Sequence, residues 1–477
     1  MQAVARERGL PVKTVHRSTL GTRLYIAKAL KGSRPRRKMP EGKTGLRRKG
    51  LRRAGMVKRY YSLYGRLLSK RNLYQAFLKV KSAKGAPGID GQSIKDFTEG
   101  IRENITKLET ELRDKSYRPK PVKRVEIPKP DGGIRKLGIP AVRDRVVQQA
   151  VLDILQPIFD GDFHPSSYGY RPGRSCHQAI GKATMFIREY GMEWVVDMDL
   201  SKCFDTLDHE IILQSFRKRI ADGSILNLLK MFLKSGVISG EGFEASEVGS
   251  PQGGVISPLV ANVYLDAFDQ FMKDRRHRIV RYADDILIFT CSKSAALNVQ
   301  AQATRYLEKE LKLTVNQEKT HIVQSSDGVA FLGIMIHTGF TVIQKKKLKS
   351  FKERIKKMTR RNSPINIPML IEELNPLCRG FANYYRIADC KNVYKSLMGW
   401  IRRRLRAKQM ALWKTPGRLH RRLRQLGHKG SFSSIRMNSW RNASCILAHL
   451  AMPNTFFDEC GLFNFETVQT GISVSVY

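Results

Sequence analysis

The chain has 477 residues, which exceeds the size of one ordinary hydrophobic core and indicates several domains. Its 86 lysines and arginines against 42 acidic residues give a formal net charge of +44, which favours nucleic acid as a partner over an anionic membrane surface. No long apolar run predicts a transmembrane helix, and the 7 cysteines, scattered without a Cys-x-x-Cys pair, argue against a disulfide framework or a zinc module.

The first 60 residues hold 19 lysines and arginines and only two acidic residues, Glu7 and Glu41. This composition is typical of an arm that binds RNA phosphates, and a solvated, partly disordered tail is the alternative. The segment resembles a transit peptide in being arginine-rich and acid-poor, but its basic character continues further than such a peptide needs. We expect a basic N-terminal extension over residues 1–65.

The segment that follows alternates helical and strand patterns. Apolar residues at helical spacing predict three helices, at residues 67–81, 97–115 and 144–159. Strand patterns at 122–127 and 134–139 flank a Pro-Asp-Gly-Gly turn, which predicts a β-hairpin.

Two adjacent carboxylates, Asp284 and Asp285, lie between apolar strand patterns in RYADDILIFT. Neighbouring anions in such a position are costly unless a cation lies against them, although an isolated Asp-Asp pair is usually just a solvated turn. Asp199 leaves another apolar strand, and Asp197 shares its face and competes for its role. Three carboxylates gathered by a sheet fit Mg²⁺, which takes oxygen ligands and leaves positions open for phosphate. Two such ions can drive nucleotidyl transfer.

The rest of the chain supplies a Gly/Pro-rich loop and further helices. GSPQGGVISP leads into a helix, and a helix at 294–311 is followed by strand patterns near 313–323 and 329–336. Residues 345–442 are basic and helical, whereas the residues from Asn442 onward contain no lysine or arginine.

These segments, in this order, resemble the motifs of a known family. The strand leading to Asp199, SPQGGVISP, YADD and FLG are similar to motifs A, B, C and E of reverse transcriptases. GAPGIDG, IPKPDGGIRKLGIP, DRVVQQAV and SSYGYRPGRSCHQAI resemble the finger blocks of the group II intron branch. LCRGFANYYRI resembles the maturase segment of the same proteins, so the resemblance extends from about residue 66 to 465.

The resemblance implies an α+β right-hand polymerase behind the basic extension. Its fingers would occupy residues 66–195 and its palm, an antiparallel sheet plus helices, residues 196–344. An α-helical thumb with the maturase RNA-binding region would occupy residues 345–442. Residues 443–477 would form a C-terminal tail without the zinc-binding endonuclease that the family often carries, because paired cysteines and histidines are absent there.

The resemblance also assigns roles to individual residues. Asp199, Asp284 and Asp285 would be the catalytic carboxylates that hold two Mg²⁺ ions, with Mn²⁺ as a substitute. Contacts to the incoming nucleotide would come from Lys129, Arg135, Phe204, Gln252, Gly253 and Lys319.

Two of these assignments have plain structural alternatives. Phe204 would be the steric gate that turns away the 2′-hydroxyl of a ribonucleotide, or else an ordinary core aromatic. Phe331, Leu332 and Gly333 match the primer grip, and a buried turn is the alternative.

The helix expected at 396–412 combines an apolar stripe with a dense set of cations. We expect these side chains to follow the phosphates of an A-form template–primer and of intron RNA: Arg402, Arg403, Arg404, Arg406 and Lys408. A solvated basic face is the alternative.

The sequence therefore predicts an RNA-directed DNA polymerase that also binds group II intron RNA to assist splicing and intron mobility. Its partners would be intron RNA, an RNA template with a DNA or RNA primer, dNTPs and target DNA, with no membrane. Two alternatives stay open: a domesticated or defence-associated enzyme without its own intron, and a splicing-only maturase. We expect a bacterial, cytoplasmic, nucleic-acid-associated protein, with an organellar location and a homodimer left open.

Overall fold

The computed structural model describes residues 58–128, 132–239, 242–250 and 253–472. The chain divides into two units, Met1–Met56 and Val57–Tyr477, and the described residues belong to the second. Nearly all of the expected N-terminal extension therefore lies outside the described residues, as do Lys129 and Gln252. None of the helices in these ranges is both long and apolar enough to cross a membrane.

The expected fingers begin with helices packed around one core: α1 (Tyr64–Leu67), α2 (Lys70–Ser82), α3 (Ile94–Glu99), α4 (Ile101–Arg113) and α5 (Val142–Asp160). The helix expected at 97–115 is two helices, because Gly100 ends α3 and begins α4. Leu73, Phe77 and Val147 are buried in this core.

The predicted β-hairpin is confirmed. β1 (Val122–Pro128) pairs antiparallel with β2 (Ile134–Ile139). β1 also pairs in parallel with β4 (Val237–Ser239), which pairs with β5 (Gly242–Glu244), so a four-stranded sheet forms in the order β2-β1-β4-β5. This long-range pairing was not predicted from the sequence.

A second four-stranded sheet forms the centre of the expected palm. Its order is β6-β7-β3-β8, and its neighbours pair antiparallel: β6 (Arg278–Tyr282), β7 (Asp285–Thr290), β3 (Trp194–Met198) and β8 (His321–Gln324). α9 (Ser257–Asp274) and α10 (Lys293–Lys309) contact this sheet, as does α6 (Cys176–Arg188).

The central strands are buried on both faces of the sheet. Val196 and Ile288 belong to the core that contains α9 and α10, whereas Val195 and Leu287 belong to a core shared with α6. Alternating side chains of β3 and β7 therefore enter two different cores, which explains why these strands are mainly apolar.

Two further helices and a small third sheet precede the C-terminal helical region. α7 (His209–Arg217) and α8 (Gly223–Leu233) pack into the first core. A three-stranded sheet, with the order β11-β10-β9, is built from β9 (Val329–Phe331), β10 (Ile334–Ile336) and β11 (Thr341–Ile343).

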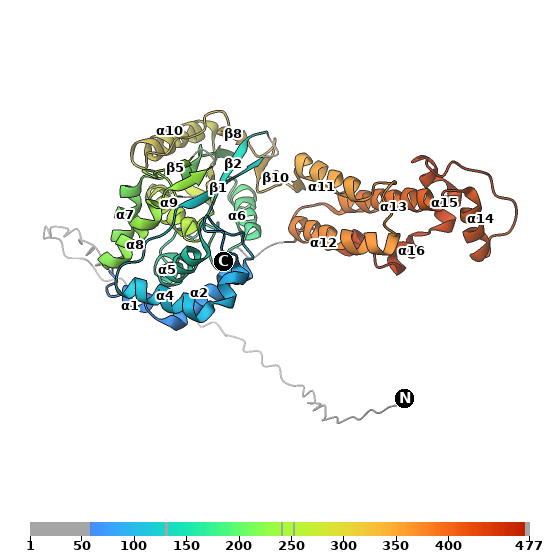
Figure 1. Cartoon of the computed structure of the whole chain (residues 1–477). Helices are drawn as coiled ribbons and strands as arrows, with labels where there is room; N and C mark the ends of the chain where they lie inside the picture. Colours follow the sequence, from blue (N-terminus) through green and yellow to red (C-terminus); the bar gives the residue numbers. More distant parts are fainter. Residues whose placement is uncertain (1–57, 129–131, 240–241, 251–252, 473–477) are drawn as a thin grey trace, which may run out of the picture. The chain divides into compact units, whose positions relative to one another are not determined.

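The C-terminal helical region begins after β11. It contains α11 (Lys345–Met358), α12 (Ile367–Tyr385), α13 (Lys391–Trp413), α14 (Pro416–Gln425), α15 (Ile446–Ala451) and α16 (Asn454–Glu459). Figure 1 shows α11, α12 and α13 beside one another. The residues after 443, expected as a tail, contribute Phe457 and Phe465 to the core around α13. The expected boundaries of the fingers, palm and thumb stay predictions.

Candidate active site

The palm sheet brings the expected catalytic carboxylates to one edge. Asp199 follows β3 directly, Asp284 lies in the turn between β6 and β7, and Asp285 is the first residue of β7. Because Met198 pairs with Ile286, the end of β3 and the start of β7 lie side by side. The two separate sequence motifs therefore meet at one site, as the sequence predicts.

These carboxylates repel one another. Burial raises the pKa of Asp285 to about 6, and the charges of Asp284 and Asp199 add to the effect, although one side of Asp285 opens onto solvent. Burial, together with the charges of Asp285 and Asp199, raises the pKa of Asp197 to about 7. A nearby cation would relieve this repulsion, and Asp197 belongs to the same electrostatic cluster as its three neighbours.

The carboxylates do not form a complete metal site by themselves among the described residues. Among the described residues, no three acidic, histidine or cysteine side chains have a geometry that could hold a metal ion by themselves. Asp199 Oδ2 lies 3.8 Å from Lys319 Nζ and accepts a hydrogen bond of 3.2 Å from Asn316 Nδ2. Within the described ranges, Asp284 and Asp285 form no ion pair. Mg²⁺ is usually bound by one or two carboxylates plus water and phosphate oxygens, so this set suits it.

The turn that carries Asp284 has an unfavourable backbone conformation. Tyr282 pairs with Asp285, so Ala283 and Asp284 form a two-residue loop, and Ala283 has a φ of +60°. A β-carbon at Gly169 would lie 2.3 Å from the Ala283 nitrogen. Only glycine at position 169 therefore allows the preceding loop to approach this turn so closely.

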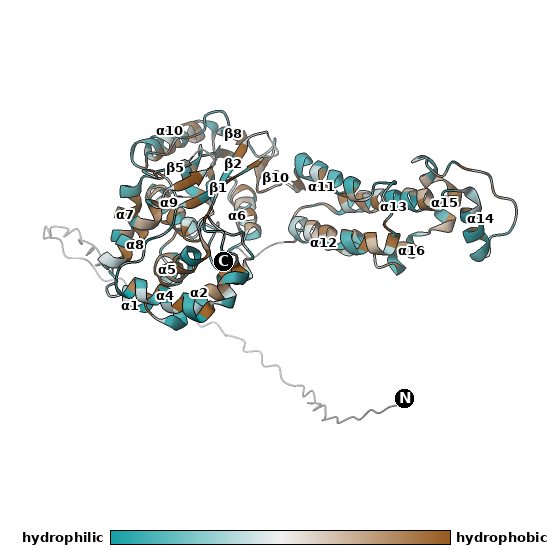
Figure 2. Cartoon of the chain, viewed as in Figure 1, coloured by the Kyte–Doolittle hydropathy of each residue, from teal (hydrophilic) through white to brown (hydrophobic). Residues whose placement is uncertain are grey.

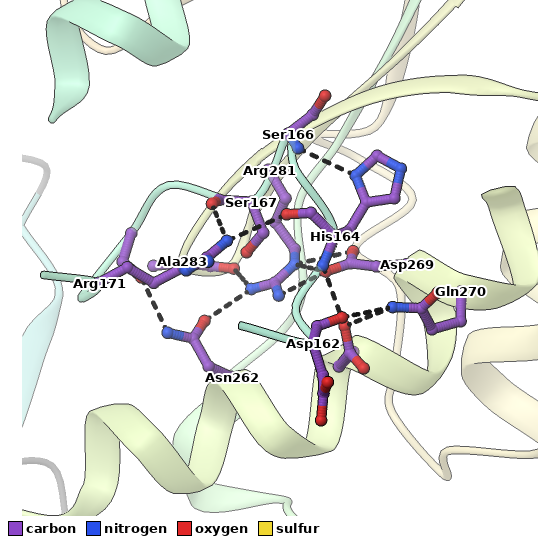
Figure 3. A network of polar contacts seen from close by, with 12 residues as sticks. Asp162, His164, Ser166, Ser167, Arg171, Asn262, Asp269, Gln270, Arg281 and Ala283 are labelled. Atoms are coloured by element: carbon purple, nitrogen blue, oxygen red, sulfur yellow. Dashed lines mark hydrogen bonds and ion pairs between the residues drawn. The ribbon is translucent and has the colours of Figure 1, made fainter. Parts of the chain in front are cut away.

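A buried arginine is bonded to the same turn (Figure 3). Arg281 donates from Nε to both Asp269 oxygens at 2.9 Å and from Nη2 to Asp269 Oδ2 at 2.6 Å. Its Nη1 donates to the Ala283 carbonyl at 2.9 Å and to Asn262 Oδ1 at 3.0 Å. Asn262 Nδ2 in turn donates to the Gly169 carbonyl at 2.9 Å. Sequence reasoning missed this group, whose signal is a charged residue inside the apolar strand RIVRY.

A second arginine fixes the loop beside Arg281. Arg171 Nη1 donates to the carbonyls of His164 and Ser167, and Ser167 forms a parallel bridge with Arg281. Burial lowers the pKa of His164, and the neighbouring cations, including Arg281 and Arg171, act in the same direction against the charge of Asp269. His164 Nδ1 accepts a hydrogen bond from the Ser166 amide, as a neutral imidazole can.

The expected steric gate lies near the carboxylates. Phe204 is 8% exposed, and its ring lies edge-on to Tyr170 with 6.4 Å between the ring centres. Burial raises the pKa of Tyr170, the charge of Asp284 adds to the effect, and Arg135 opposes it. Tyr170 therefore lies within electrostatic range of both the finger hairpin and the catalytic turn, and sequence reasoning missed it.

Two further expected contacts have clear local constraints. Gly253 has a φ of +112°, and a β-carbon there would lie 2.5 Å from the Gly138 carbonyl oxygen on β2. The chain thus passes directly against the hairpin, which requires glycine at position 253. The expected primer-grip turn lies against α12, since the Tyr384 hydroxyl donates to the Leu332 carbonyl at 2.8 Å.

The structure does not present the five cations expected to follow RNA phosphates as one exposed row on α13, because four of the five are buried. Arg402, Arg404, Arg406 and Lys408 are 7%, 7%, 2% and 0% exposed, and only Arg403 of the five is exposed. Burial lowers the pKa of both Arg404 and Arg406 to about 10, with repulsion from Arg361 and Arg402 respectively contributing.

These cations are buried because other helices enclose α13. The long side chains of α13 donate hydrogen bonds to carbonyls at the C-terminal ends of those helices. Arg404 Nη2 donates to the carbonyls of Lys356 and Thr359 at the end of α11. Arg406 Nε donates to the Met452 carbonyl after α15. Positive charge is favourable at helix C-termini, where carbonyls lack helical partners. Lys408 bonds two carbonyls of the segment after α11, and Arg402 pairs with Asp458 and Glu466.

Positive charge gathers around a cavity at the end of α11. The cavity has a volume of about 470 Å³, and Asn362, Glu353 and Trp440 form part of its lining. The rest of the lining is cationic: Lys356, Lys357, Arg360, Arg361 and Arg404. The guanidinium carbons of Arg361 and Arg404 lie 4.8 Å and 4.4 Å from the centre of the Trp440 ring. Arg361 Nη1 is buried without a hydrogen-bond partner among the described residues. Such a group of like charges favours an anionic ligand.

Comparison with known proteins gives two family matches. Residues 127–336 match the model described as "Reverse transcriptase (RNA-dependent DNA polymerase)", and residues 348–427 match "Group II intron, maturase-specific domain". Both ranges fall where the motifs in the sequence place the polymerase and maturase regions.

The chain is also similar to individual proteins. Protein YkfC of Escherichia coli is 38% identical over 291 residues, which cover 53% of this chain and 76% of YkfC. Group II intron-encoded protein LtrA of Lactococcus lactis is 30% identical over 339 residues, which cover 57% of this chain. The chain spans 56% of the length of LtrA. Telomerase from Candida albicans has a TM-score of 0.38 at 12% identity and covers 67% of this chain and 66% of that one.

Proposed function

Since the chain belongs to the group II intron reverse transcriptases that carry a maturase-specific domain, we propose that it synthesises DNA on RNA templates and binds intron RNA. The observation that supports the chemistry best is the meeting of Asp199, Asp284 and Asp285 at one edge of the palm sheet. The same carboxylates argue against a splicing-only maturase, which has no use for them. A domesticated or defence-associated enzyme without its own intron is the remaining alternative.

Asp199, Asp284 and Asp285 would hold a pair of Mg²⁺ ions, with Mn²⁺ as a substitute, which when bound favour attack by the primer 3′-hydroxyl and departure of pyrophosphate. Lys319, 3.8 Å from Asp199, keeps a positive charge beside the phosphates of the nucleotide. Arg135 on the exposed hairpin supplies a second cation for the triphosphate.

Selection of the nucleotide would rest on the surface beside these carboxylates. Phe204, supported by Tyr170, would fill the space that a 2′-hydroxyl needs. Gly253 would allow the backbone to approach the sugar and base. Lys129 and Gln252, which lie outside the described residues, keep the roles that the family implies.

RNA would bind at the basic cavity at the end of α11, to whose lining α13 contributes Arg404. This cavity would receive a phosphate of the RNA backbone, since Arg361 offers an unpaired donor and Lys356 and Lys357 are exposed beside it. The remaining partners would be a DNA or RNA primer, dNTPs and target DNA. We place the protein with nucleic acid in a bacterial cytoplasm, as the bacterial relatives suggest. An organellar location and a homodimer stay open.

Replacement of Asp284 tests the proposed activity. Asp284→Asn keeps the shape of the side chain but removes its charge, so extension of a DNA primer on an RNA template should fall by several orders of magnitude. RNA binding should persist, because phosphate contacts supply most of the affinity. Asp274→Asn, the same change on an exposed residue at the end of α9, is the control. Extension at the wild-type rate by Asp284→Asn would refute the assignment.

A further inference from the structure

We propose that Arg281 is a positioning residue, which acts with Asp269 and Asn262 to hold the catalytic turn in place. The proposal rests on the proposed function in one respect, namely that Asp284 and Asp285 carry the chemistry. Arg281 touches neither carboxylate. It acts through the Ala283 carbonyl, which lies between the strand and the two aspartates.

The burial of this ion pair is energetically costly and needs an explanation. Arg281 and Asp269 side chains are both 0% exposed. Apolar residues of similar size often stabilise a protein as well as a buried ion pair does, or better, because two charges need not leave water. Stability alone therefore gives little reason for a charged pair at this point of the sheet.

The conformation of the turn also requires a stabilising contact. Ala283 has a φ of +60°, which residues with a β-carbon rarely adopt. The turn therefore needs stabilising contacts from residues outside it to keep this conformation. Arg281 Nη1 supplies one through the Ala283 carbonyl. The neighbouring carbonyl of Gly169 is fixed by Asn262, which also accepts a bond from Arg281. The two chain segments that touch at the turn are thus fixed by one connected group of side chains (Figure 3).

This role makes a specific prediction about catalysis. A displacement of about 1 Å in a reacting group can lower a rate about 100-fold without any change in affinity for the substrate. Loss of the hydrogen bond from Arg281 to the Ala283 carbonyl should therefore lower kcat and raise the Mg²⁺ concentration needed for half-maximal activity. The dissociation constant for a primer–template should stay unchanged, because Arg281 is buried.

The test must separate positioning from folding. Arg281→Met alone leaves the Asp269 carboxylate buried and unpaired, which destabilises the fold for a trivial reason. Arg281→Met combined with Asp269→Leu removes both charges, so the thermal unfolding midpoint should return to the wild-type value or above it. If Arg281 is a positioning residue, kcat for primer extension should nevertheless remain about 100-fold low. A return of kcat and of the Mg²⁺ requirement together with stability would overturn the proposal.

Two further variants complete the experiment. Arg143→Met combined with Glu111→Leu replaces an ion pair between α5 and α4, which has no bond to the turn, and should leave kcat unchanged. Arg281→Lys keeps a positive charge for Asp269 but has no second nitrogen to donate to the Ala283 carbonyl. This variant should therefore be stable but have a low kcat. An equal loss of kcat in the Arg143 variant would also overturn the proposal. A wild-type protein that extends no primer would refute the proposed function itself, before any variant is compared.

Discussion

Asp197 and Asp285 are two carboxyl groups with raised pKa values near one edge of the palm sheet. Burial and mutual repulsion raise their pKa values to about 7 and about 6. Both side chains would be held in their charged form by a divalent ion. Binding of such an ion should therefore release protons near neutral pH, as is usual when a metal ion competes with protons for its ligands.

Phe204 provides a prediction at the scale of one residue. Phe204→Val opens space beside the nucleotide sugar, so the ratio of ribonucleotide to deoxyribonucleotide incorporation should rise by at least about tenfold. Single-nucleotide extension with matched dNTP and rNTP pairs measures this ratio. Phe216→Val, the same truncation at a buried position in α7, should leave the ratio unchanged. If the two variants behave alike, Phe204 is only a core aromatic packed on Tyr170.

At the scale of elements, helices of this protein bond one another through their ends as well as their faces. From α13, Arg404 donates a hydrogen bond to a carbonyl at the end of α11, and Arg406 donates one to a carbonyl just after α15. These bonds give buried arginines partners that also satisfy otherwise unpaired carbonyls. Basic composition in this region therefore serves the packing of helices as much as the binding of RNA. Figure 2 shows α11 and α14 mainly in the hydrophilic colour, in keeping with their exposed cations.

α9 provides a prediction about pH. Burial and the charge of Asp269 raise the pKa of Asp266 to about 6 from its ordinary value of 3.8. A carboxyl group with a raised pKa in the folded state costs stability once it ionises, so this cost grows between about pH 4 and pH 6 and is complete above. Asp266→Asn keeps an oxygen for the bonds from the His164 amide and Gln270 Nε2. It should raise stability by on the order of 2 kcal/mol at pH 8 and change it little near pH 4.

Urea denaturation of the wild type and Asp266→Asn at the two pH values measures this difference. Asp274→Asn, on an exposed position of the same helix, should show no such dependence on pH. A lower stability of Asp266→Asn at pH 8 would show that the charged form is the favoured one.

At the scale of the whole molecule, the excess of positive charge is the dominant property. The formal charge of +44 must be balanced by a polyanion or by many counterions. Much of the basic residue content that appeared available to RNA in α13 is internal. The role expected for the extension over residues 1–65 stays a prediction.

The basic cavity at the end of α11 can be distinguished from general attraction between charges. Lys356→Gln with Arg361→Gln removes two charges from the cavity, and Lys349→Gln with Arg354→Gln removes two exposed charges from the same helix. The cavity pair should weaken binding of a folded group II intron fragment more, and should reduce the slope of log K against log salt by about one. Filter binding across a salt series measures both. Equal losses in the two double variants would mean that the cavity holds no particular phosphate.

Properties that depend on neighbours in the chain could be predicted from the sequence alone. The hairpin of β1 and β2 follows from two strand patterns and a short turn, and α10 follows from helical spacing. The meeting of Asp199, Asp284 and Asp285 at one edge of the sheet was also predictable, because each lies at an end of an apolar strand pattern. The period of a strand and the shape of a tight turn are set by local sterics, so the sequence carries them directly.

Properties that depend on distant partners were decided only by the tertiary structure. A sequence shows that Arg281, Arg404 and Lys408 are charged, but not whether a carboxylate or a helix end will lie against them. That answer comes from segments up to 48 residues away, such as the end of α11 for Arg404. A long cation in a helical pattern suits solvent, RNA and a buried carbonyl equally well. Only the packing of α13 among its neighbours placed Arg404 and Lys408 against backbone carbonyls, and only the tertiary structure placed Arg281 against Asp269 and the Ala283 carbonyl.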